Sequence, residues 1–268
     1  MSNWKLFIVD GKTHLVDLDL KIIDIPKFGR FPSKSLSNKV DNLSFDFLGS
    51  KCSLIDYSLA DVHSNLRRGP QIISPKDIAW IIYKSGLSTG DVVVEAGCGS
   101  AALTVALAQV VAPDEKVFTF ESNSKHVVVA KSNIDMSPWK DLVEFREEEL
   151  DENTASIEAS VVILDLPNPQ KLVSWSRKSL KFGGLLICYL PTINQVEVLL
   201  PELDHWSEVE IVETMQRSWR PNQSALRPES TMLGHTGFIV SARLFDYFFG
   251  TTILESLSIS SKCLMLIK

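Results

Sequence analysis

The sequence predicts an α/β fold in which a small β domain precedes a larger domain built on a parallel, doubly wound sheet. Two observations support this. Residues 1 to about 60 contain short apolar segments typical of strands, whereas from Ser74 onward strand-like and helix-like segments alternate. Strands that alternate with helices are typical of parallel sheets with crossover connections. The 268 residues, of which 45% are apolar, are sufficient for two unequal domains with a large core.

The first domain is expected to span residues 1–62. Its strands are predicted over 6–9, 13–16 and 22–25, where apolar and β-branched residues cluster. The dipeptide Asp10-Gly11 lies between the first two strands, and Asp-Gly is a strong hairpin signal. A linker with the adjacent charges Arg67 and Arg68 follows this domain.

The second domain is expected to span residues 63–243. Its first helix is predicted to start at Pro75, with Ser74 as N-cap, and to end at Gly86. Further strands are predicted over 92–94, 116–121, 142–145, 161–164 and 185–189, and further helices over 101–111, over 124–135 and from about 192. The remaining residues, 244–268, form an apolar extension that we expect to pack on the core or at a subunit contact.

Composition narrows the possible partners and the compartment. The net charge of −6 gives no global basic field, so any RNA contact must use local patches. The four cysteines lie far apart and show no metal-ligand spacing, which predicts a reducing cytoplasm and no metal. We find no signal-peptide pattern and no run of the roughly 20 apolar residues that a membrane span requires, so no membrane partner is expected.

The segment from Glu95 to Ser100, with Gly97 and Gly99 inside it, is predicted to be a cofactor loop. It follows a strand and opens a helix, and glycines there let backbone amides approach a ligand beside the positive end of the helix dipole. The third glycine of the dinucleotide pattern is missing, because position 102 is alanine. With Glu95 before the first glycine, this favours S-adenosylmethionine over NAD. The alternative is a tight strand-to-helix turn without a ligand.

Two further acidic residues are predicted to complete the cofactor site. Glu121 ends the next strand about 20 residues later, where an acidic residue accepts hydrogen bonds from ribose hydroxyls. Glu149, after the third strand, is expected on the adenine side, although Glu147 or Glu148 fits that role equally well. A solvated charge is the alternative for each.

Asp165 is the strongest candidate for a catalytic residue. It directly follows the apolar run 161–164 and precedes Pro167 and Pro169, which cannot extend a strand. The carboxylate is therefore presented at the carboxyl end of a buried strand, where open α/β sheets bind ligands. The alternative is an acid that only caps a lysine or a backbone amide.

Five segments resemble, in order, the motifs of the TrmI family of tRNA adenine-N1 methyltransferases, particularly its archaeal members. They are residues 67–77, 95–100, 165–167, 189–196 and 232–238, and the resemblance covers about 60–243. It implies a class I, Rossmann-like, S-adenosylmethionine-dependent methyltransferase with a small N-terminal β domain, assembled as a homotetramer. The implied reaction is tRNA methylation at N1 of adenosine 58 in the T loop, and in some archaeal relatives also at position 57.

The resemblance also implies roles for individual residues. Asp165 matches the catalytic aspartate, which acts on the adenine N6 amino group and adjoins the cofactor, and Tyr189 matches an aromatic position near the target base. Positions that match cofactor contacts are Gln71, Ser100, Ala101, Glu121 and Glu149, beside Glu95, Gly97 and Gly99 of the loop. The family usually has glycine at Ala101 and aspartate at Glu149. We expect Ala101 to have a negative φ, as a residue in the first turn of a helix would.

RNA contacts and alternative functions complete the predictions. Phosphate contacts are expected from Arg67, Arg68, Lys76, Arg217, Arg220 and Arg227, although charged residues are often only solvated. His235 is predicted to be structural, near a subunit contact, and Tyr189 equally fits a core aromatic. Two other functions stay open: a class I methyltransferase with a different acceptor, and a catalytically silent tRNA-binding subunit. The retained glycines, Glu121 and Asp165 favour an active enzyme.

Overall fold

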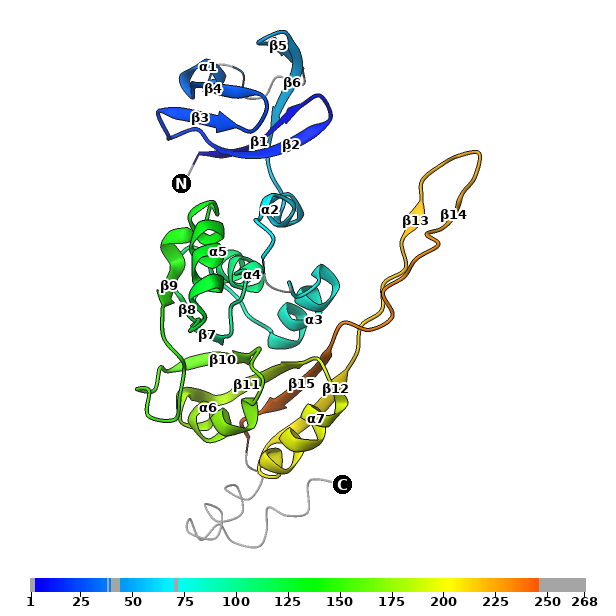
Figure 1. The fold of residues 1–268 in the computed structure, drawn as a ribbon. Coiled ribbons are helices and arrows are strands. Elements are labelled where there is room, and N and C mark those ends of the chain that lie inside the picture. The colour runs from blue at the N-terminus through cyan, green and yellow to red at the C-terminus, as the bar shows by residue number, and fades with distance from the viewer. Residues whose placement is uncertain (1–2, 38, 40–43, 70–71, 246–268) are drawn as a thin grey trace, which may run out of the picture.

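The centre of the molecule is a seven-stranded sheet with the order β12-β15-β11-β10-β7-β8-β9 (Figure 1). The computed structural model describes residues 3–37, 39, 44–69 and 72–245. The strands are β7 (Val93–Ala96), β8 (Val117–Phe120), β9 (Val143–Arg146), β10 (Ala159–Leu164), β11 (Leu180–Leu190), β12 (Ser207–Val212) and β15 (Phe238–Arg243). The β-branched runs at 92–94 and 161–164 form the middle of this sheet, as predicted.

One strand corrects the prediction of an all-parallel sheet. β15 pairs antiparallel with both of its neighbours, β11 and β12. The chain leaves β12 and returns into β15 through a long hairpin at the same end of the sheet, without a crossover, so the return strand must run in the opposite direction. β11 begins at Leu180, five residues before the strand predicted over 185–189, and it includes Gly183 at φ +83°. A Cβ at Gly184 would lie 2.9 Å from the carbonyl oxygen of Ser160.

Helices cover both faces of the sheet and produce two apolar cores. α2 (Leu59–Asn65), α3 (Pro75–Ser85) and α4 (Ala102–Val111) contribute to one core. The other contains residues of α6 (Val173–Ser179) and α7 (Ile193–Leu199). α5 (Ser124–Asp135) packs beside the loop that follows β7. Short 3-10 turns occupy Lys140–Leu142, Pro169–Leu172 and Leu200–Leu203. α3 starts and ends where predicted, with Gly86 at φ +62° after its last turn.

The N-terminal β domain is confirmed as a separate small layer. β2-β1-β6-β5 form one sheet, and β3-β4 form a hairpin beside it. The elements are β1 (Trp4–Val9), β2 (Lys12–Asp17), β3 (Ile22–Ile25), β4 (Gly29–Pro32), α1 (Lys34–Ser37), β5 (Phe45–Phe47) and β6 (Ser50–Ile55). Asp10 and Gly11 have φ +48° and +73°, as a type I′ hairpin turn requires. Phenylalanine rings around the buried Phe7 fill its core.

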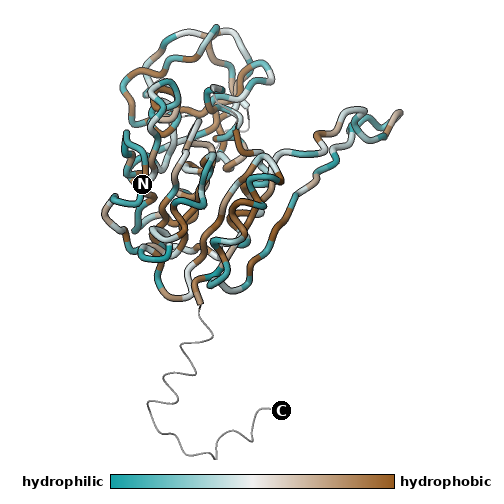
Figure 2. Tube along the Cα trace, turned by 60° about the horizontal axis from the view of Figure 1, so that its bottom comes forward, coloured by the Kyte–Doolittle hydropathy of each residue, from teal (hydrophilic) through white to brown (hydrophobic). Residues whose placement is uncertain are grey.

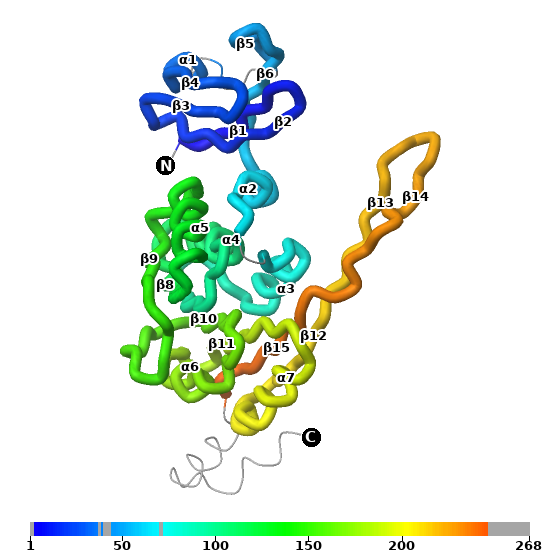
Figure 3. The backbone as a smooth tube through the Cα atoms, viewed as in Figure 1, coloured from blue at the N-terminus to red at the C-terminus, as the bar shows by residue number. Residues whose placement is uncertain are grey.

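Residues 213–237, called the arm below, connect β12 to β15 and project far from the sheet (Figures 1 and 3). Within the arm, only short pairing is seen between β13 (Trp219–Arg220) and β14 (Arg227–Pro228). Apolar residues concentrate in the central sheet, whereas polar and apolar residues mix along the arm (Figure 2). Trp219, which would be expected to pack in a core, is 55% exposed there. None of the helices in the described part of the chain is long and apolar enough to cross a membrane.

Candidate active site

The predicted site residues gather where the parallel strands end at their carboxyl edge. The glycine loop, residues 97–101, connects β7 to α4, Glu121 follows β8, and Asp165 follows β10. β7 lies between β8 and β10 in the sheet. The three segments are therefore adjacent in space, although the first and the last of them are about 70 residues apart along the chain. This edge is the general ligand-binding position of open α/β sheets.

The glycine loop approaches the end of β10 so closely that a side chain at Gly97 is impossible. A Cβ atom at Gly97 would lie 2.0 Å from the carbonyl oxygen of Asp165. Asp165 in turn donates its backbone N–H to the carbonyl of Ala96 (2.9 Å). Gly97 and Gly99 also have positive φ values, +86° and +56°, which favour glycine. Both glycines therefore serve the turn, and Gly97 also permits the close approach to Asp165.

Glu121 holds the loop from the other side. Its Oε2 accepts the backbone N–H of Gly99 (3.0 Å), and its Oε1 accepts that of Asn123 (2.8 Å). The side chain is 7% exposed, and the Nδ1 atom of His126 lies 3.6 Å from Oε2. Glu121 is thus a fixed carboxylate at the rim of the loop.

Asp165 has an unusual carboxyl group. Burial, together with the nearby charges of Glu95 and Glu121, raises its pKa to about 7. A carboxyl group that titrates near neutral pH at the end of a strand is a candidate for proton or hydrogen-bond chemistry.

Glu95 lies deeper than predicted. It is 2% exposed, and its Oε2 accepts hydrogen bonds from Thr104 (2.5 Å) and Thr119 (2.7 Å). Burial raises its pKa to about 7, although the two threonine hydrogen bonds act in the opposite direction. The carboxyl group of Glu95 therefore joins the end of β7 to α4 and β8 beneath the loop, and its contact with the cofactor stays a prediction.

The expectation for Ala101 is wrong. Ala101 is the N-cap of α4 with φ +64° and ψ +23°, the left-handed conformation, and it is completely buried. The last residue of the loop still belongs to the turn and not to the helix. This explains the preference for glycine here, since a Cβ in this conformation costs about 1–2 kcal/mol. The preceding Ser100 is buried as well.

The remaining predicted cofactor contacts are less defined. Glu149 is exposed after β9, as are Glu147 and Glu148, so all three remain candidates for the adenine side. Glu147 is paired with Lys131. Gln71 lies outside the described residues.

The donor set fits a cationic nucleoside cofactor. Three carboxyl groups, those of Glu95, Glu121 and Asp165, lie near one another. The charge of Glu121 helps to raise the pKa of Glu95, and the charges of Glu95 and Glu121 help to raise that of Asp165. A positively charged ligand would relieve this repulsion, and S-adenosylmethionine carries a sulfonium charge next to a ribose. Glu121 would hold the ribose hydroxyls, and the loop would accommodate the amino-acid end. Within the described ranges, no group of three or more His, Cys, Asp or Glu residues could hold a metal ion.

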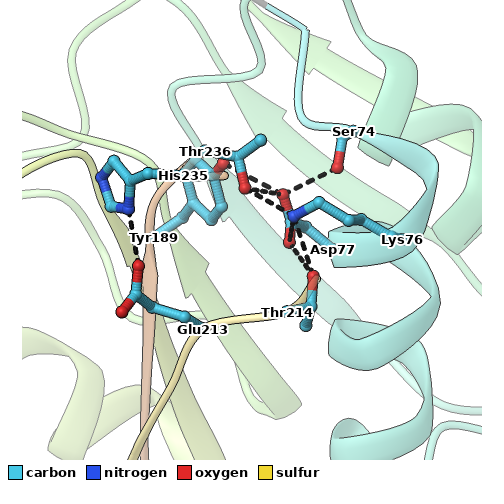
Figure 4. Close-up of polar contacts among 8 residues, drawn as sticks. All are labelled: Ser74, Lys76, Asp77, Tyr189, Glu213, Thr214, His235 and Thr236. Atoms are coloured by element: carbon cyan, nitrogen blue, oxygen red, sulfur yellow. Dashed lines mark hydrogen bonds and ion pairs between the residues drawn. The ribbon is translucent and has the colours of Figure 1, made fainter. Parts of the chain in front are cut away.

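A second polar cluster lies beside this edge, around the fully buried Asp77 (Figure 4). Its carboxylate accepts hydrogen bonds from five side chains: Ser74 (2.8 Å), Lys76 (2.8 Å), Thr214 (2.5 Å), Thr236 (2.7 Å) and Tyr189 (3.2 Å). Burial alone would raise the pKa of Asp77, but the hydrogen bonds from its neighbours lower it. We call this group the latch, because it joins the start of α3 to both stems of the arm.

The latch accounts for two of the predicted residues. Tyr189 is 6% exposed, its hydroxyl donates to Asp77, and a Cβ at Gly237 would lie 2.6 Å from its ring. The ring is thus packed in the core and bonded to the latch, as in the alternative given for it. Lys76 also donates to Thr214 (2.9 Å) and Thr236 (2.6 Å), so all three of its ammonium donors are used and none remains for a phosphate.

His235 reinforces the base of the arm. Its Nδ1 lies 2.6 Å from Glu213 Oε1, and its Nε2 lies 2.9 Å from the carbonyl oxygen of Pro191. The hydrogen bonds to Pro191 and Glu213 raise its pKa. Glu213 and His235 belong to opposite stems of the arm, so their contact joins the two stems beside the latch.

The predicted RNA contacts fall into two groups. Arg67 and Arg68 are exposed next to the glycine loop, whereas Arg217, Arg220 and Arg227 are on the arm. Arg220 is paired with Glu229 (2.8 Å), which reduces its availability for phosphate. The arginines therefore do not form one continuous patch along the sequence or the fold.

Two structural groups escaped the sequence analysis. Asp77 was part of the motif 67–77 and Asn133 part of the helix predicted over 124–135, and neither was singled out. Asn133 lies between the buried Ala130 and Ile134 on the apolar face of α5 and is itself fully buried. A polar residue on an apolar face is the signal that could have identified it.

Comparison with known proteins agrees with this geometry. The family model described as "tRNA methyltransferase complex GCD14 subunit" matches residues 62–232. The chain is 30% identical over 219 residues to tRNA (adenine(57)-N(1)/adenine(58)-N(1))-methyltransferase TrmI of Methanocaldococcus jannaschii, a match that covers 71% of this chain and 78% of that protein.

Solved structures show the same fold. An S-adenosylmethionine-dependent O-methyltransferase from Thermotoga maritima is similar with a TM-score of 0.72 and 26% identity, covering 90% of this chain and 92% of the other. The tRNA (m1A58) methyltransferase TrmI from Aquifex aeolicus has a TM-score of 0.69 and 25% identity, covering 91% and 98%. The class I methyltransferase fold is thus confirmed. Because the family model matches well over half of its length, the chain belongs to the GCD14 family, to which the predicted TrmI motifs had pointed.

Proposed function

We propose that this protein transfers a methyl group from S-adenosylmethionine to N1 of adenosine 58 in the T loop of tRNA, with position 57 as a second target. The observation that carries the proposal is the carboxyl group of Asp165, with a pKa near 7, fixed against the glycine loop at the end of β10. Membership of the family supplies the class of acceptor.

The chain's own residues define what happens at the base. S-adenosylmethionine supplies a methyl group that is already activated by its sulfonium. Ionised Asp165 accepts a hydrogen bond from the N6 amino group of adenine, which increases electron density on N1. The N1–CH3 bond forms as the S–CH3 bond breaks, and S-adenosylhomocysteine leaves. Asp165 stabilises the resulting cation or takes up the N6 proton. Groups of this kind contribute roughly 10²–10⁴-fold.

The target base must leave its stack to reach Asp165, which costs a few kcal/mol. Phosphate contacts offset this cost. We assign them to Arg67 and Arg68 beside the glycine loop and to Arg217 and Arg227 on the arm, all of which are exposed. Binding through such contacts weakens steeply as the salt concentration rises.

We also propose that the chain assembles with copies of itself, as a homotetramer, in the cytoplasm. Met215, Leu226 and Leu233 on the arm are 74%, 68% and 68% exposed. Exposed apolar surface of this kind is typical of a contact with another protein. A cavity of about 1260 Å³ offers a complementary surface for the arm of another copy. It is lined mainly by α2, α3 and the segment between them, and Leu233 of the chain's own arm lies at it. The buried free thiols Cys52, Cys98 and Cys188 are consistent with a reducing compartment.

The test is methyl transfer from labelled S-adenosylmethionine to an unmodified tRNA transcript. Four reactions are compared: wild type, Asp165→Ala, a transcript without adenosine at position 58, and one without adenosine at 57. We expect incorporation to fall roughly 100-fold or more with Asp165→Ala. It should fall in part with each transcript that lacks one adenosine, and vanish with a further transcript that lacks both.

Other outcomes would replace the proposal. Incorporation that survives the loss of both adenosines would show a different acceptor, as would activity on small-molecule hydroxyls. No incorporation and no cofactor binding by calorimetry would support the silent RNA-binding subunit.

A further inference from the structure

Asn133, on the last turn of α5, bonds to two separate backbone segments at once. Its Oδ1 accepts the N–H of Arg67 (2.7 Å), and its Nδ2 donates to the carbonyl oxygens of Arg67 (3.0 Å) and Ser100 (2.8 Å). Arg67 belongs to the linker segment Leu66–Gly69 before α3, and Ser100 belongs to the glycine loop. The residue is completely buried. Both N–H donors of the carboxamide are therefore used, and they are used on different parts of the chain.

The linker segment is also pressed against α5. A Cβ at Gly69 would lie 3.0 Å from Cγ2 of Val129, which is tighter than ordinary contact, and Leu66 is buried in the core below. The segment therefore has little freedom to move with respect to α5. Through Asn133, the same helix fixes the carbonyl of Ser100.

The loop needs such a restraint because it is strained where Asn133 holds it. Ser100 precedes Ala101, whose left-handed conformation is unfavourable for alanine. Strained residues persist only where the surrounding structure leaves no alternative. Without the bond to Ser100, this part of the loop is free to relax into a shape with a more favourable Ala101.

We propose that Asn133 is a positioning residue for cofactor binding. Its carboxamide fastens the Ser100 end of the glycine loop to the linker segment, so the loop has its binding shape before the cofactor arrives. Preorganisation of this kind raises affinity because binding does not have to restore the shape. The inference rests on the placement of S-adenosylmethionine at this loop, proposed above. It also places the exposed Arg67 at a fixed distance from the cofactor.

The test is the Kd of S-adenosylmethionine, measured by calorimetry on the full chain without tRNA and well below the Tm of each variant. In Asn133→Asp the shape and the acceptor for Arg67 N–H are retained, but two carbonyl oxygens face a carboxylate in place of their donor. In Asn133→Ser those hydrogen bonds are lost without adding charge. We expect the Kd to rise roughly 10- to 100-fold in both, as the loss of one or two buried hydrogen bonds predicts.

Two controls separate the possible outcomes. Val127→Ala removes buried packing from the same helix, and we expect it to lower the Tm while leaving the Kd unchanged. Glu121→Gln tests the placement of the cofactor itself. If Glu121→Gln weakens binding and the Asn133 variants do not, the inference is overturned and the placement stands. If no variant changes the Kd, both are overturned. If both Asn133 variants unfold while Val127→Ala remains folded, Asn133 is a structural residue and the inference is also overturned.

Discussion

The proposed chemistry depends on the carboxyl group of Asp165. The surroundings of this group set the pH range in which it is ionised. Burial is the larger cause of its raised pKa, and the charges of Glu95 and Glu121 add to it. A raised pKa means that the carboxylate becomes available only as the pH rises through about 7. Below that value the protonated acid can no longer accept the N6 hydrogen bond in the form that activates N1.

We therefore expect kcat/KM to rise with pH and to level off above about 7, with roughly a tenfold loss for each pH unit below it. In Glu95→Gln the acceptor for Thr104 and Thr119 remains but a neighbouring charge is removed, so the rise should shift to lower pH. Initial rates with limiting S-adenosylmethionine across pH 5–9 would measure the shift. Glu158→Gln, which changes an exposed acid just before β10, is the matched control and should leave the profile in place.

A substitution at Ala101 is expected to stabilise the protein. In Ala101→Gly the Cβ is removed from a left-handed residue, so we expect a gain of about 1 kcal/mol in the free energy of unfolding and a Tm higher by about 2–4 °C. Ala106 lies in the interior of α4. Ala106→Gly should lower stability by about 1 kcal/mol, because glycine weakens a helix interior. Thermal unfolding measures both variants. If both substitutions change the Tm in the same direction, the left-handed conformation of Ala101 does not account for the effect.

At the scale of elements, the sequence predicted those strands and helices that have a clear pattern of neighbouring residues. The runs at 92–94 and 161–164 are β-branched and bounded by turn residues, and α5 occupies the predicted residues 124–135. α6 was missed because its seven residues follow directly after a 3-10 turn and carry no strong apolar period. β12 and β15 were not among the predicted strands. The direction of β15 depends on how the chain returns to the sheet, which no residue within the strand encodes.

The candidate site divides along the same line. Asp165 and Glu121 could be predicted because each directly ends an apolar strand, and strand ends meet at one edge. The latch could not, since the partners of Asp77 are separated from it by 137 residues at Thr214 and 159 at Thr236. Lys76 illustrates the consequence: its charge suggested a phosphate contact, but the fold uses all its donors internally.

The latch predicts how the arm is held. In Asp77→Asn, the ammonium of Lys76 stays buried without a counter-charge, and breaking such a pair costs about 3–5 kcal/mol. We expect hydrogen exchange to accelerate in residues 213–216 and 234–237 at the base of the arm. Asp91→Asn is the matched control, because Asp91 accepts hydrogen bonds from Ser88 and Ser160 in another region. An unchanged exchange rate at the arm base in Asp77→Asn, with normal folding, would contradict a role for the latch in fixing the arm.

At the scale of the whole molecule, the arm is the feature that a single chain does not explain. A two-stranded hairpin is at best marginally stable in water, and here only Trp219 with Pro228 and Arg220 with Arg227 pair. Yet the base of the arm is fixed by the fully buried Asp77 and closed by His235 and Glu213. A fixed base that carries a weakly paired extension with exposed apolar side chains is the arrangement expected when the extension packs on another subunit.

The double substitution Met215→Asp and Leu226→Asp tests this directly. Both side chains are largely exposed in the single chain, so the substitutions should leave its Tm almost unchanged. Buried in a subunit contact, the same two carboxylates would cost several kcal/mol each, and light scattering should show the assembly falling apart into smaller species. Val128→Asp, equally exposed on α5, should keep the wild-type mass. If the double variant keeps that mass as well, the arm does not hold the subunits together. The alternative is that its exposed apolar residues contact the tRNA, and the KM for tRNA should then rise while the mass stays constant.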